Sequence, residues 1–257
     1  MSGIEARGLC VSLDGRPILH HIDLAVPLGS FVGLIGPNGA GKSTLMRAVA
    51  GLLPVSGDVL IGERPLQTLR DKERARRLAY MAQSRDIAWP MTVEEIIALG
   101  RLPHRPPFTG LSRVDTDVIE RVIAEMDLSG LRGRLVTQLS GGEVARVMTA
   151  RALAQDTSIV IADEPTAGLD PAHQLNLMQV FRQLSRGGRT VIVSLHELGL
   201  AARWCERLVL IDRGRIVADG PPERVLTPEN LRAVYRIDAY LGRDDGGLLV
   251  VPTGISA

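Results

Sequence analysis

Residues 36–44, GPNGAGKST, combine closely spaced glycines with a lysine and two hydroxyl side chains. They fit the pattern Gly, four residues, Gly-Lys-Ser, which wraps backbone N–H groups around phosphate oxygens. Lys42 would place its charge on β- and γ-phosphates, and the Ser43 hydroxyl would be a Mg²⁺ ligand. An apolar run precedes the motif and a helical pattern follows it, so the positive helix end would also face the anion. We therefore predict a nucleotide-phosphate site made of Gly36, Pro37, Asn38, Gly39, Ala40, Gly41, Lys42, Ser43 and Thr44.

A second apolar run, SIVIADEP at 158–165, ends in two acidic residues. In open α/β folds, ligands bind at the carboxyl ends of the strands. Asp163 would hold Mg²⁺ through water, and Glu164 would orient or deprotonate an attacking water. An acidic pair at a strand end is by itself typical of a solvated loop. The phosphate motif upstream is what favours the chemical interpretation.

Three further polar residues fit the same site. Gln83 and His196 each follow an apolar strand-like run, which places an amide and an imidazole at the same sheet edge. Gln83 could reach Mg²⁺ or the attacking water, and His196 could contact the γ-phosphate. Asp170 lies in the turn AGLD shortly after Glu164. Each one alone is typical of an ordinary hydrogen-bonded polar group, so their common position is what supports a function.

The stretch QLSGGEVARVMTARALA, residues 138–154, has the pattern of a second anion site at a helix N-terminus. Its serine and two glycines precede a helical run, about a hundred residues after the phosphate motif. A helix start on a separate subdomain is poorly placed to reach the nucleotide of its own chain. A second copy of the chain would use it more economically.

The pattern of apolar runs predicts the elements that carry these motifs. Buried strands are expected at 31–36, 78–83, 158–163, 190–195 and 207–212, mostly separated by helical segments, which indicates a largely parallel sheet. The opening residues predict shorter antiparallel strands around the turn at 14–17, and residues 211–220 predict a hairpin. Between 84 and 154 the patterns are amphipathic helices. We expect one α/β domain: a core with antiparallel β subdomain (1–83 and 155–235), an inserted helical subdomain (84–154) and a C-terminal tail (236–257).

Composition excludes several function classes. The 30 Lys and Arg nearly balance 29 Asp and Glu, and aromatic residues make up 3%, so neither the charge nor a stacking surface points to nucleic acid. The N-terminus lacks a signal-peptide pattern, and no apolar run approaches the length of a membrane span. We expect a cytoplasmic protein whose membrane function, if any, runs through a partner.

With these motifs in their order, the chain resembles the ATPases of the ATP-binding cassette (ABC) family over nearly its whole length. GPNGAGKST, the glutamine of MAQ, LSGGE, SIVIADEP, AGLD and the histidine of SLHE occur at roughly the family's spacing. The resemblance implies a P-loop NTPase (RecA-like) fold and ATP hydrolysis with ATP and Mg²⁺. It implies catalytic roles for Glu164, His196 and Gln83. The implied Mg²⁺ ligands are Ser43, Gln83 and Asp163.

The same resemblance explains the second helix start. In this family two nucleotide-binding domains pair head to tail, and LSGGE of one closes over the γ-phosphate held by the other. We refer to residues 140–143 (Ser140, Gly141, Gly142 and Glu143) as the signature segment, and to Asp170 as a residue of communication within the dimer.

Longer stretches, such as TVEEIIALGRLPHR and LRAVYRID, are similar to ATPases of bacterial importers for iron–siderophore complexes, haem and cobalamin. This similarity implies a homodimer, peripheral at the cytoplasmic face of the inner membrane, beneath a permease dimer that receives substrate from a periplasmic binding protein. A cytoplasmic helix of the permease would dock along residues from Gln83 to about Phe108, including Trp89.

Two departures from the family pattern matter. LSGGERQR reads LSGGEVAR here, so Val144 and Ala145 put the local hydrogen bonding in question, although not the backbone N–H groups. Leu13 stands where an aromatic residue would stack on adenine. Arg16 could stack its guanidinium there instead, or Leu13 could belong to the core and leave the base to another residue.

A second function class stays open: a soluble cassette ATPase that acts on a non-transport partner, such as a cluster-assembly complex. Chain length alone does not separate the two classes. Neighbouring genes for a many-span permease and a binding protein would favour the importer.

Overall fold

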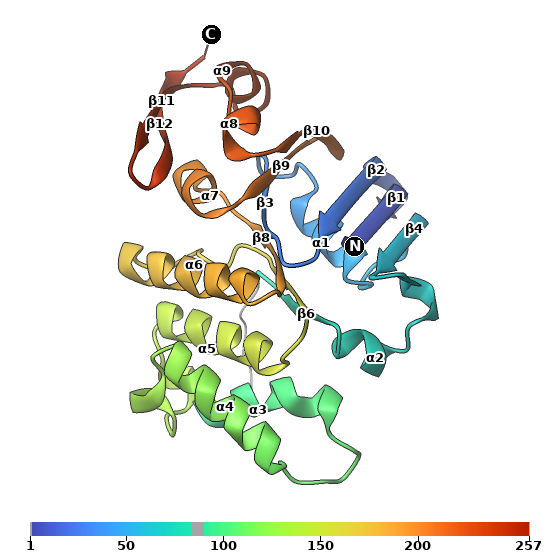
Figure 1. The fold of residues 1–257 in the computed structure, drawn as a ribbon, viewed down its shortest axis with the longest axis vertical. Coiled ribbons are helices and arrows are strands. Elements are labelled where there is room, and N and C mark those ends of the chain that lie inside the picture. The colour runs from blue at the N-terminus through green and yellow to red at the C-terminus, as the bar shows by residue number, and fades with distance from the viewer. Residues whose placement is uncertain (1, 84–89, 257) are drawn as a thin grey trace.

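The computed structural model describes residues 2–83 and 90–256, and its central feature is a six-stranded sheet (Figure 1). The strand order is β10-β9-β3-β8-β7-β6, with parallel pairing from β9 to β6 and an antiparallel hairpin of β9 and β10. The predicted α/β fold with a mostly parallel sheet is confirmed. The strands are β3 (Phe31–Ile35), β6 (Leu78–Met81), β7 (Ile159–Ala162), β8 (Thr190–Ser194), β9 (Arg207–Asp212) and β10 (Arg215–Gly220).

The central strands are apolar throughout because both of their faces are covered. Alternate residues of a strand point to opposite faces. In β8, Val191 and Val193 join a core built with the helices α5, α6 and α7, whereas Ile192 joins a core built with α1 and the antiparallel sheet. Helix α6 (Pro171–Arg186) connects β7 to β8, α7 (Leu198–Trp204) connects β8 to β9, and α1 (Lys42–Val49) follows β3.

The antiparallel sheet has the order β2-β1-β4-β5 and lies beside α1 (Figure 1). Its strands are β1 (Ser2–Leu13), β2 (Arg16–Pro27), β4 (Ser56–Ile61) and β5 (Arg64–Pro65). The prediction of short strands was wrong, since β1 and β2 run for 12 residues each. Along most of β2 buried and exposed residues alternate, because one face packs on α1 and the other meets solvent. Between this sheet and β6 lie η1 (Leu66–Thr68) and α2 (Asp71–Ala75).

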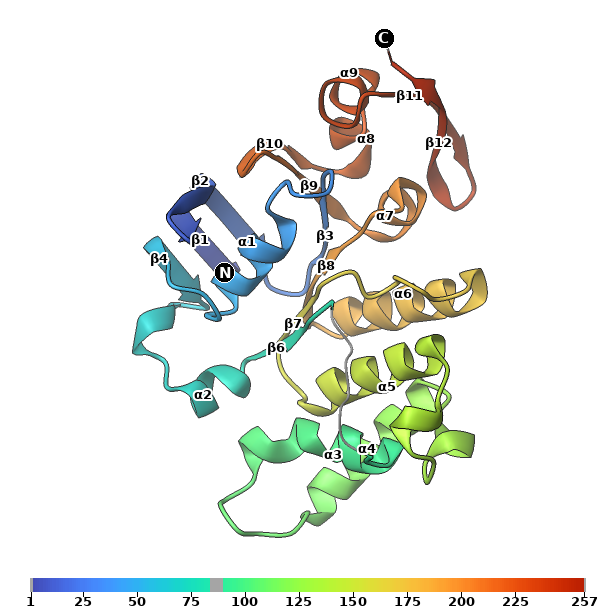
Figure 2. The ribbon, with the colours of Figure 1, turned by 180° about the vertical axis from the view of Figure 1, so that it is seen from behind.

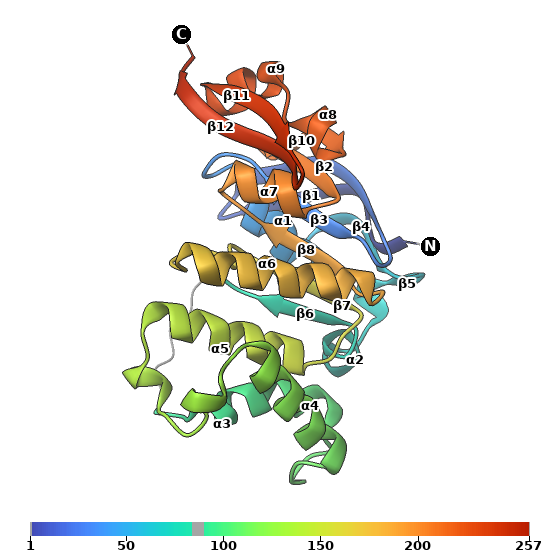
Figure 3. The same ribbon diagram turned by 60° about the vertical axis from the view of Figure 1, so that its left-hand side comes forward.

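Helices stack below the sheet in the segment between β6 and β7 (Figures 2 and 3). They are α3 (Val93–Ala98), η2 (Leu99–His104), α4 (Arg113–Glu125), η3 (Ser129–Leu131), η4 (Val136–Gln138) and α5 (Gly141–Ala154). Capping boxes begin α3, α4 and α5 at Thr92, Ser112 and Ser140. Residues 84–89, with Trp89, lie outside the described residues, and the exact division of the chain into subdomains stays a proposal.

The last residues form more structure than a tail. After α8 (Pro222–Val225), α9 (Pro228–Asn230) and the π-helical η5 (Leu231–Tyr235), strands β11 (Ile237–Asp244) and β12 (Gly247–Ile255) pair as a hairpin. The hairpin packs beside α7 (Figure 3), where Leu248 and Val250 are buried. In the described part of the chain, no helix has both the length and the apolar character needed to cross a bilayer.

Candidate nucleotide site

A cavity of about 490 Å³ opens at the carboxyl ends of the central strands. The phosphate loop, the end of β6 and the ends of β7 and β8 meet there because parallel strands bring their carboxyl ends to one edge. The structure thus brings together most of the residues singled out from the sequence. The lining consists of Ile18, Asn38, Gly39, Gly41, Lys42, Ser43, Thr44, Gln83, Glu164 and His196.

The phosphate loop depends on glycine at its first position. Gly36 has φ 151°, and a Cβ there would lie 2.1 Å from the carbonyl oxygen of Ile211. Gly36, Pro37 and Ala40 form the back of the loop, buried or half-buried behind the lining residues. Glycine therefore lets the loop pass directly against β9.

Lys42 is held in place by the loop itself. Its side chain is buried, and Nζ donates hydrogen bonds to the carbonyl oxygens of Gly36, at 2.8 Å, and Pro37, at 3.1 Å. Burial lowers the pKa of Lys42, while the charges of Glu164 and Asp163 act in the opposite direction. The ammonium is therefore pre-placed at the loop and can exchange these carbonyls for phosphate oxygens.

Ser194 organises the acidic pair. Its fully buried hydroxyl donates to Asp163 Oδ1 at 2.7 Å and accepts the backbone N–H of Glu164 at 2.8 Å. Glu164 has φ 48°, a left-handed conformation that is costly for a residue with a Cβ. Tyr80 Oη donates to the other Asp163 oxygen at 3.4 Å. Neither Ser194 nor Tyr80 was predicted as a site residue, although each is a polar interruption in an apolar strand.

The Glu164 carboxylate joins the two other predicted polar residues. Gln83 Nε2 donates to Oε2 at 2.5 Å, and His196 Nε2 contacts Oε1. β6 ends at Met81 rather than at the glutamine, so Gln83 lies on the loop that follows the strand. A water that Glu164 binds for attack must replace or share one of these contacts.

The oxygen donors at this edge fit Mg²⁺. Ser43 and Gln83 line the cavity, and the carboxylate of Asp163 lies behind it with its oxygens held by Ser194 and Tyr80. Hydroxyl, amide and carboxylate oxygens are the ligands of this hard cation. Among the described residues, no cluster of three or more His, Cys, Asp and Glu could hold a metal alone. This donor set suits a Mg²⁺ ion whose coordination would be completed by phosphate oxygens of the substrate.

The signature segment lies apart from this cavity. Among its described lining residues none comes from 140–143, and Ser140 and Gly141 are exposed at the start of α5. Ser140 Oγ accepts the N–H of Glu143 at 3.3 Å, and Glu143 Oε2 accepts the Ser140 N–H at 2.7 Å. Ala145 is buried and Val144 is half-buried against the core. The capping box is present although the family's usual polar pair is absent here.

Asp170 lies outside the cavity lining as well. Its carboxylate accepts the backbone N–H of His173 at 3.0 Å, and its other oxygen contacts His173 Nδ1 at 2.7 Å. It is thus the N-cap of α6. Its role in communication within a dimer stays a proposal.

Ile18 lines the cavity, whereas Leu13 and Arg16 are not among its described lining residues. Leu13 packs, half-buried, against the core of the antiparallel sheet, and Arg16 is exposed at the turn between β1 and β2. The turn of the β9–β10 hairpin holds the Ile18 region, since His20 N–H donates to the Gly214 carbonyl at 2.9 Å. Gly214 N–H donates in turn to Ala40 at 2.9 Å. The alternative in which Leu13 belongs to the core agrees with this packing.

Comparison with known proteins identifies the family. The family model described as ABC transporter matches residues 19–167. A hemin import ATP-binding protein of Nocardia farcinica is 43% identical over 91% of this chain and 82% of its own length. A cobalamin import ATP-binding protein of Halobacterium salinarum is 39% identical over 97% of this chain and 63% of its own length.

A similar fold occurs in a solved structure described as a metal-chelate type ABC transporter in an inward-facing conformation. Its TM-score is 0.83, with 21% identity, over 98% of this chain and 97% of that chain. At that identity the likeness concerns the fold, which agrees with the match of the family model and the sequence relatives. The arrangement of the cavity, the family model and the relatives together show that the chain belongs to the ABC transporter family.

Proposed function

We propose that this chain is the ATP-hydrolysing, energy-coupling subunit of a bacterial importer for a metal chelate, acting as a head-to-tail homodimer beneath a permease. One observation carries the proposal. The phosphate loop, Gln83, Glu164 and His196 meet in one cavity, whereas Ser140 and Gly141 of the signature segment lie exposed outside its described lining. A site divided in this way is completed by a second copy.

The reaction is ATP plus water to ADP and phosphate, and the residues divide the work. Lys42 and the loop amides bind the β- and γ-phosphates and stabilise the charge that develops on them. Glu164 holds the attacking water or takes its proton, and His196 contacts the γ-phosphate. Ser43, Gln83 and Asp163 would hold Mg²⁺, which neutralises phosphate charge when it is bound.

The second copy supplies the missing face. The start of α5 presents the amides of Gly141 and Gly142 on an exposed helix end, which suits a phosphate oxygen. In a head-to-tail pair each signature segment would cover the nucleotide on its partner's loop, so ATP would lie in the interface. Hydrolysis then removes the shared γ-phosphate and loosens the pair.

The permease would dock along the stretch from Gln83 to about Phe108, of which the structure describes Gln83 and residues from 90 onward. Phe108 is fully exposed on the loop between η2 and α4, and Leu102 on the same segment is 54% exposed. Exposed apolar side chains on this stretch would suit contact with a protein partner. The chain would then lie at the cytoplasmic face of the inner membrane, with a periplasmic binding protein delivering substrate to the permease.

We propose haem as the chelate, supported by the 43% identity to a hemin import ATP-binding protein, and keep cobalamin and iron–siderophore complexes as alternatives. The test is to express the chain with the permease of its own gene cluster, purify the complex and reconstitute it in liposomes. ATP hydrolysis is measured with a binding protein that is empty, or loaded with haem, cobalamin or a ferric siderophore. We expect the largest stimulation with haem, and none in a Glu164→Gln complex. Failure to associate with any permease would instead favour the non-transport class.

A further inference from the structure

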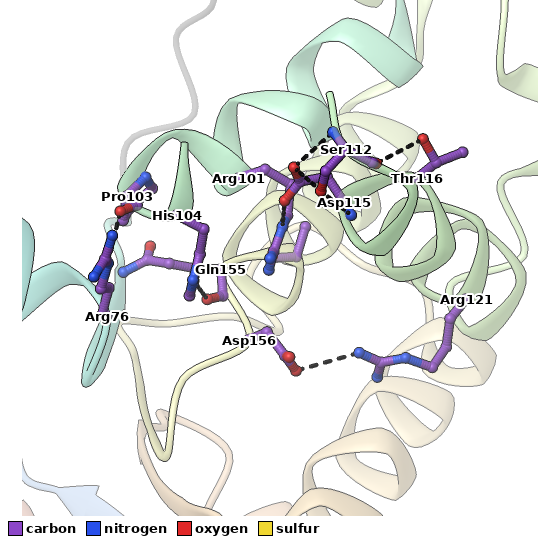
Figure 4. A network of polar contacts seen from close by, with 11 residues as sticks. Arg76, Arg101, Pro103, His104, Ser112, Asp115, Thr116, Arg121, Gln155 and Asp156 are labelled. Carbon is purple, nitrogen blue, oxygen red and sulfur yellow. Dashed lines mark hydrogen bonds and ion pairs between the residues drawn. The ribbon is translucent and has the colours of Figure 1, made fainter. Parts of the chain in front are cut away.

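A buried ion pair in the helical region has no part in the mechanism above. Arg101 of η2 and Asp115 of α4 are 3% and 4% exposed, and Arg101 Nε lies 2.8 Å from Asp115 Oδ1 (Figure 4). Burying two charges costs free energy that a simple surface pair would not cost. The further hydrogen bonds of Arg101 and Asp115 give a better explanation of the pair.

Arg101 also holds the last turn of α5. Its Nη1 donates to the carbonyl oxygen of Ala154 at 2.8 Å, and His104 Nε2 donates to that of Gln155 at the same distance (Figure 4). The final carbonyls of a helix lack partners within it, and a cation there favours the negative end of the helix dipole. Gly100 permits this contact, because a Cβ at that position would lie 2.3 Å from the Arg151 carbonyl oxygen.

The same end of α5 is fastened to the sheet. Gln155 Nε2 donates to the carbonyl oxygens of Leu78, at 2.8 Å, and Ala75, at 2.5 Å. Arg76, just before β6, donates back to the Pro103 carbonyl at 2.8 Å. The base of α5 is therefore held from two sides, by η2 and α4 and by the segment that leads into β6 and Gln83.

Asp115 is fixed behind Arg101. Its second oxygen accepts the Ser112 N–H at 3.0 Å and the Ser112 hydroxyl at 2.6 Å. Burial alone would raise the pKa of Asp115, but the hydrogen bonds from Ser112 and Arg101 bring it down to about 2. The carboxylate stays charged, and the guanidinium spans Asp115 and Ala154 with separate N–H groups. A lysine ammonium lacks that planar fork.

We refer to the contacts of Arg101, His104 and Gln155 at the end of α5 as the clamp. Because α5 is long, the clamp also affects the position of the opposite end of the helix. Its 14 residues span about 21 Å from the clamp to the signature segment. A tilt of about 5° at the base would move that segment by about 2 Å, and misplacement by about 1 Å can cost 10²-fold in rate.

We propose that Arg101 is a positioning residue that fixes the direction of α5 and so places the signature segment on the nucleotide held by the partner copy. This inference rests on the proposed function, because it requires the head-to-tail dimer. Arg101 acts through α5 and not on the chain's own phosphate loop. Its loss should therefore separate ATP binding from ATP-driven pairing.

The test uses the Glu164→Gln chain, which should hold ATP without hydrolysing it. Arg101→Lys is added, and the dimer dissociation constant at saturating ATP is measured by sedimentation, with ATP affinity measured on dilute monomer. We expect a dimer at least about tenfold weaker and an ATP affinity that stays within about twofold. In the active chain, kcat should fall with little change in KM. The control is Arg132→Lys, since Arg132 pairs with Glu94 and Glu120 within the helical region.

The outcomes separate the two ideas. Equal dimerisation of the Arg101→Lys and Arg132→Lys chains would overturn the positioning role while leaving the dimer intact. A Glu164→Gln parent that stays monomeric with ATP would overturn the dimer, and this inference with it. If Arg101→Lys does not fold, Gln155→Glu replaces it, since a carboxylate cannot donate to the carbonyls of Leu78 and Ala75. The same weakening is expected, and unaltered pairing of that variant would refute the clamp.

Discussion

Two helices of this chain, α1 and α5, have N-termini suited to bind an anion. The unpaired backbone N–H groups of these two ends are treated differently. α1 starts after Gly41, which has φ 107°, and within the described residues no side chain caps its first turn. α5 starts after Ser140, which closes a capping box with Glu143. The first end lines the cavity beside Lys42, and the second is exposed.

The difference indicates how each end is used. The amides at the start of α1 would bind a nucleotide held by the same chain. In the structure, Lys42 donates hydrogen bonds to the carbonyl oxygens of the loop. The start of α5 satisfies part of its own hydrogen bonding and is therefore stable without any ligand. A helix end that is capped in part by its own side chains suits a site used only when a second copy arrives.

Glu164→Gln should keep both helix ends on the nucleotide and stop turnover. The amide keeps the size of the side chain but cannot accept a proton, so turnover should fall about 10²–10⁴-fold. ATP binding should persist, and the variant should accumulate as an ATP-bound dimer because closure precedes chemistry. Steady-state phosphate release and sedimentation with ATP check the two parts. Near-normal turnover would remove Glu164 from the mechanism.

A mixed dimer tests whether the two ends belong to different chains. Lys42→Ala damages the α1 end and Ser140→Arg the α5 end, so each mutant homodimer has both composite sites broken. A mixed dimer of one chain of each kind has one site intact and should trap about one nucleotide. Trapped nucleotide per dimer is the measurement. Normal hydrolysis by either mutant as a monomer would show that the ends do not share a site.

Ser194→Ala tests how far the cavity at the α1 end depends on the hydroxyl that holds Asp163 and Glu164. It removes the hydroxyl that accepts the half-buried Glu164 N–H and donates to Asp163 Oδ1, so stability should fall by about 1–3 kcal/mol. We expect kcat to fall about tenfold with KM for ATP little changed, because the loop is untouched. Ser194→Thr, which keeps the hydroxyl, should restore most activity. The control is Ser185→Ala, which removes another buried hydroxyl far from the cavity.

The smallest effect is expected at Ile18. Ile18→Ala removes apolar contact from the cavity wall and should weaken ATP binding about threefold to tenfold. The rate at saturating ATP should stay unchanged, because a contact present before and during the reaction is uniform binding. Leu13→Tyr, in contrast, should lower thermal stability without tightening ATP binding. Tighter ATP binding by that variant in nucleotide titrations would return the base contact to Leu13.

Much of the site could be predicted because its residues lie in short local patterns. The phosphate loop is one uninterrupted stretch, and Glu164 and His196 each follow an apolar run whose strand could be recognised. The partners of Asp163 could not be predicted, since Ser194 and Tyr80 lie 31 and 83 positions away from it. The sequence around a hydroxyl residue in a strand does not indicate which distant group its side chain will bond to. The hairpin at the end of the chain was missed because Gly-containing, half-buried strands alternate weakly.

The sequence by itself determined which chemistry is possible here, because the backbone of the phosphate loop and the charges of Lys42 and Glu164 follow from residue types in a fixed local order. Only the tertiary structure decided that Ile18 rather than Leu13 faces the cavity, and that Arg101 holds the base of α5. Both depend on contacts between segments far apart in the chain, where several packings satisfy the same pattern of apolar and polar residues. The fold selects one of them through close approaches such as Gly100 against Arg151 and Gly214 against Ile18.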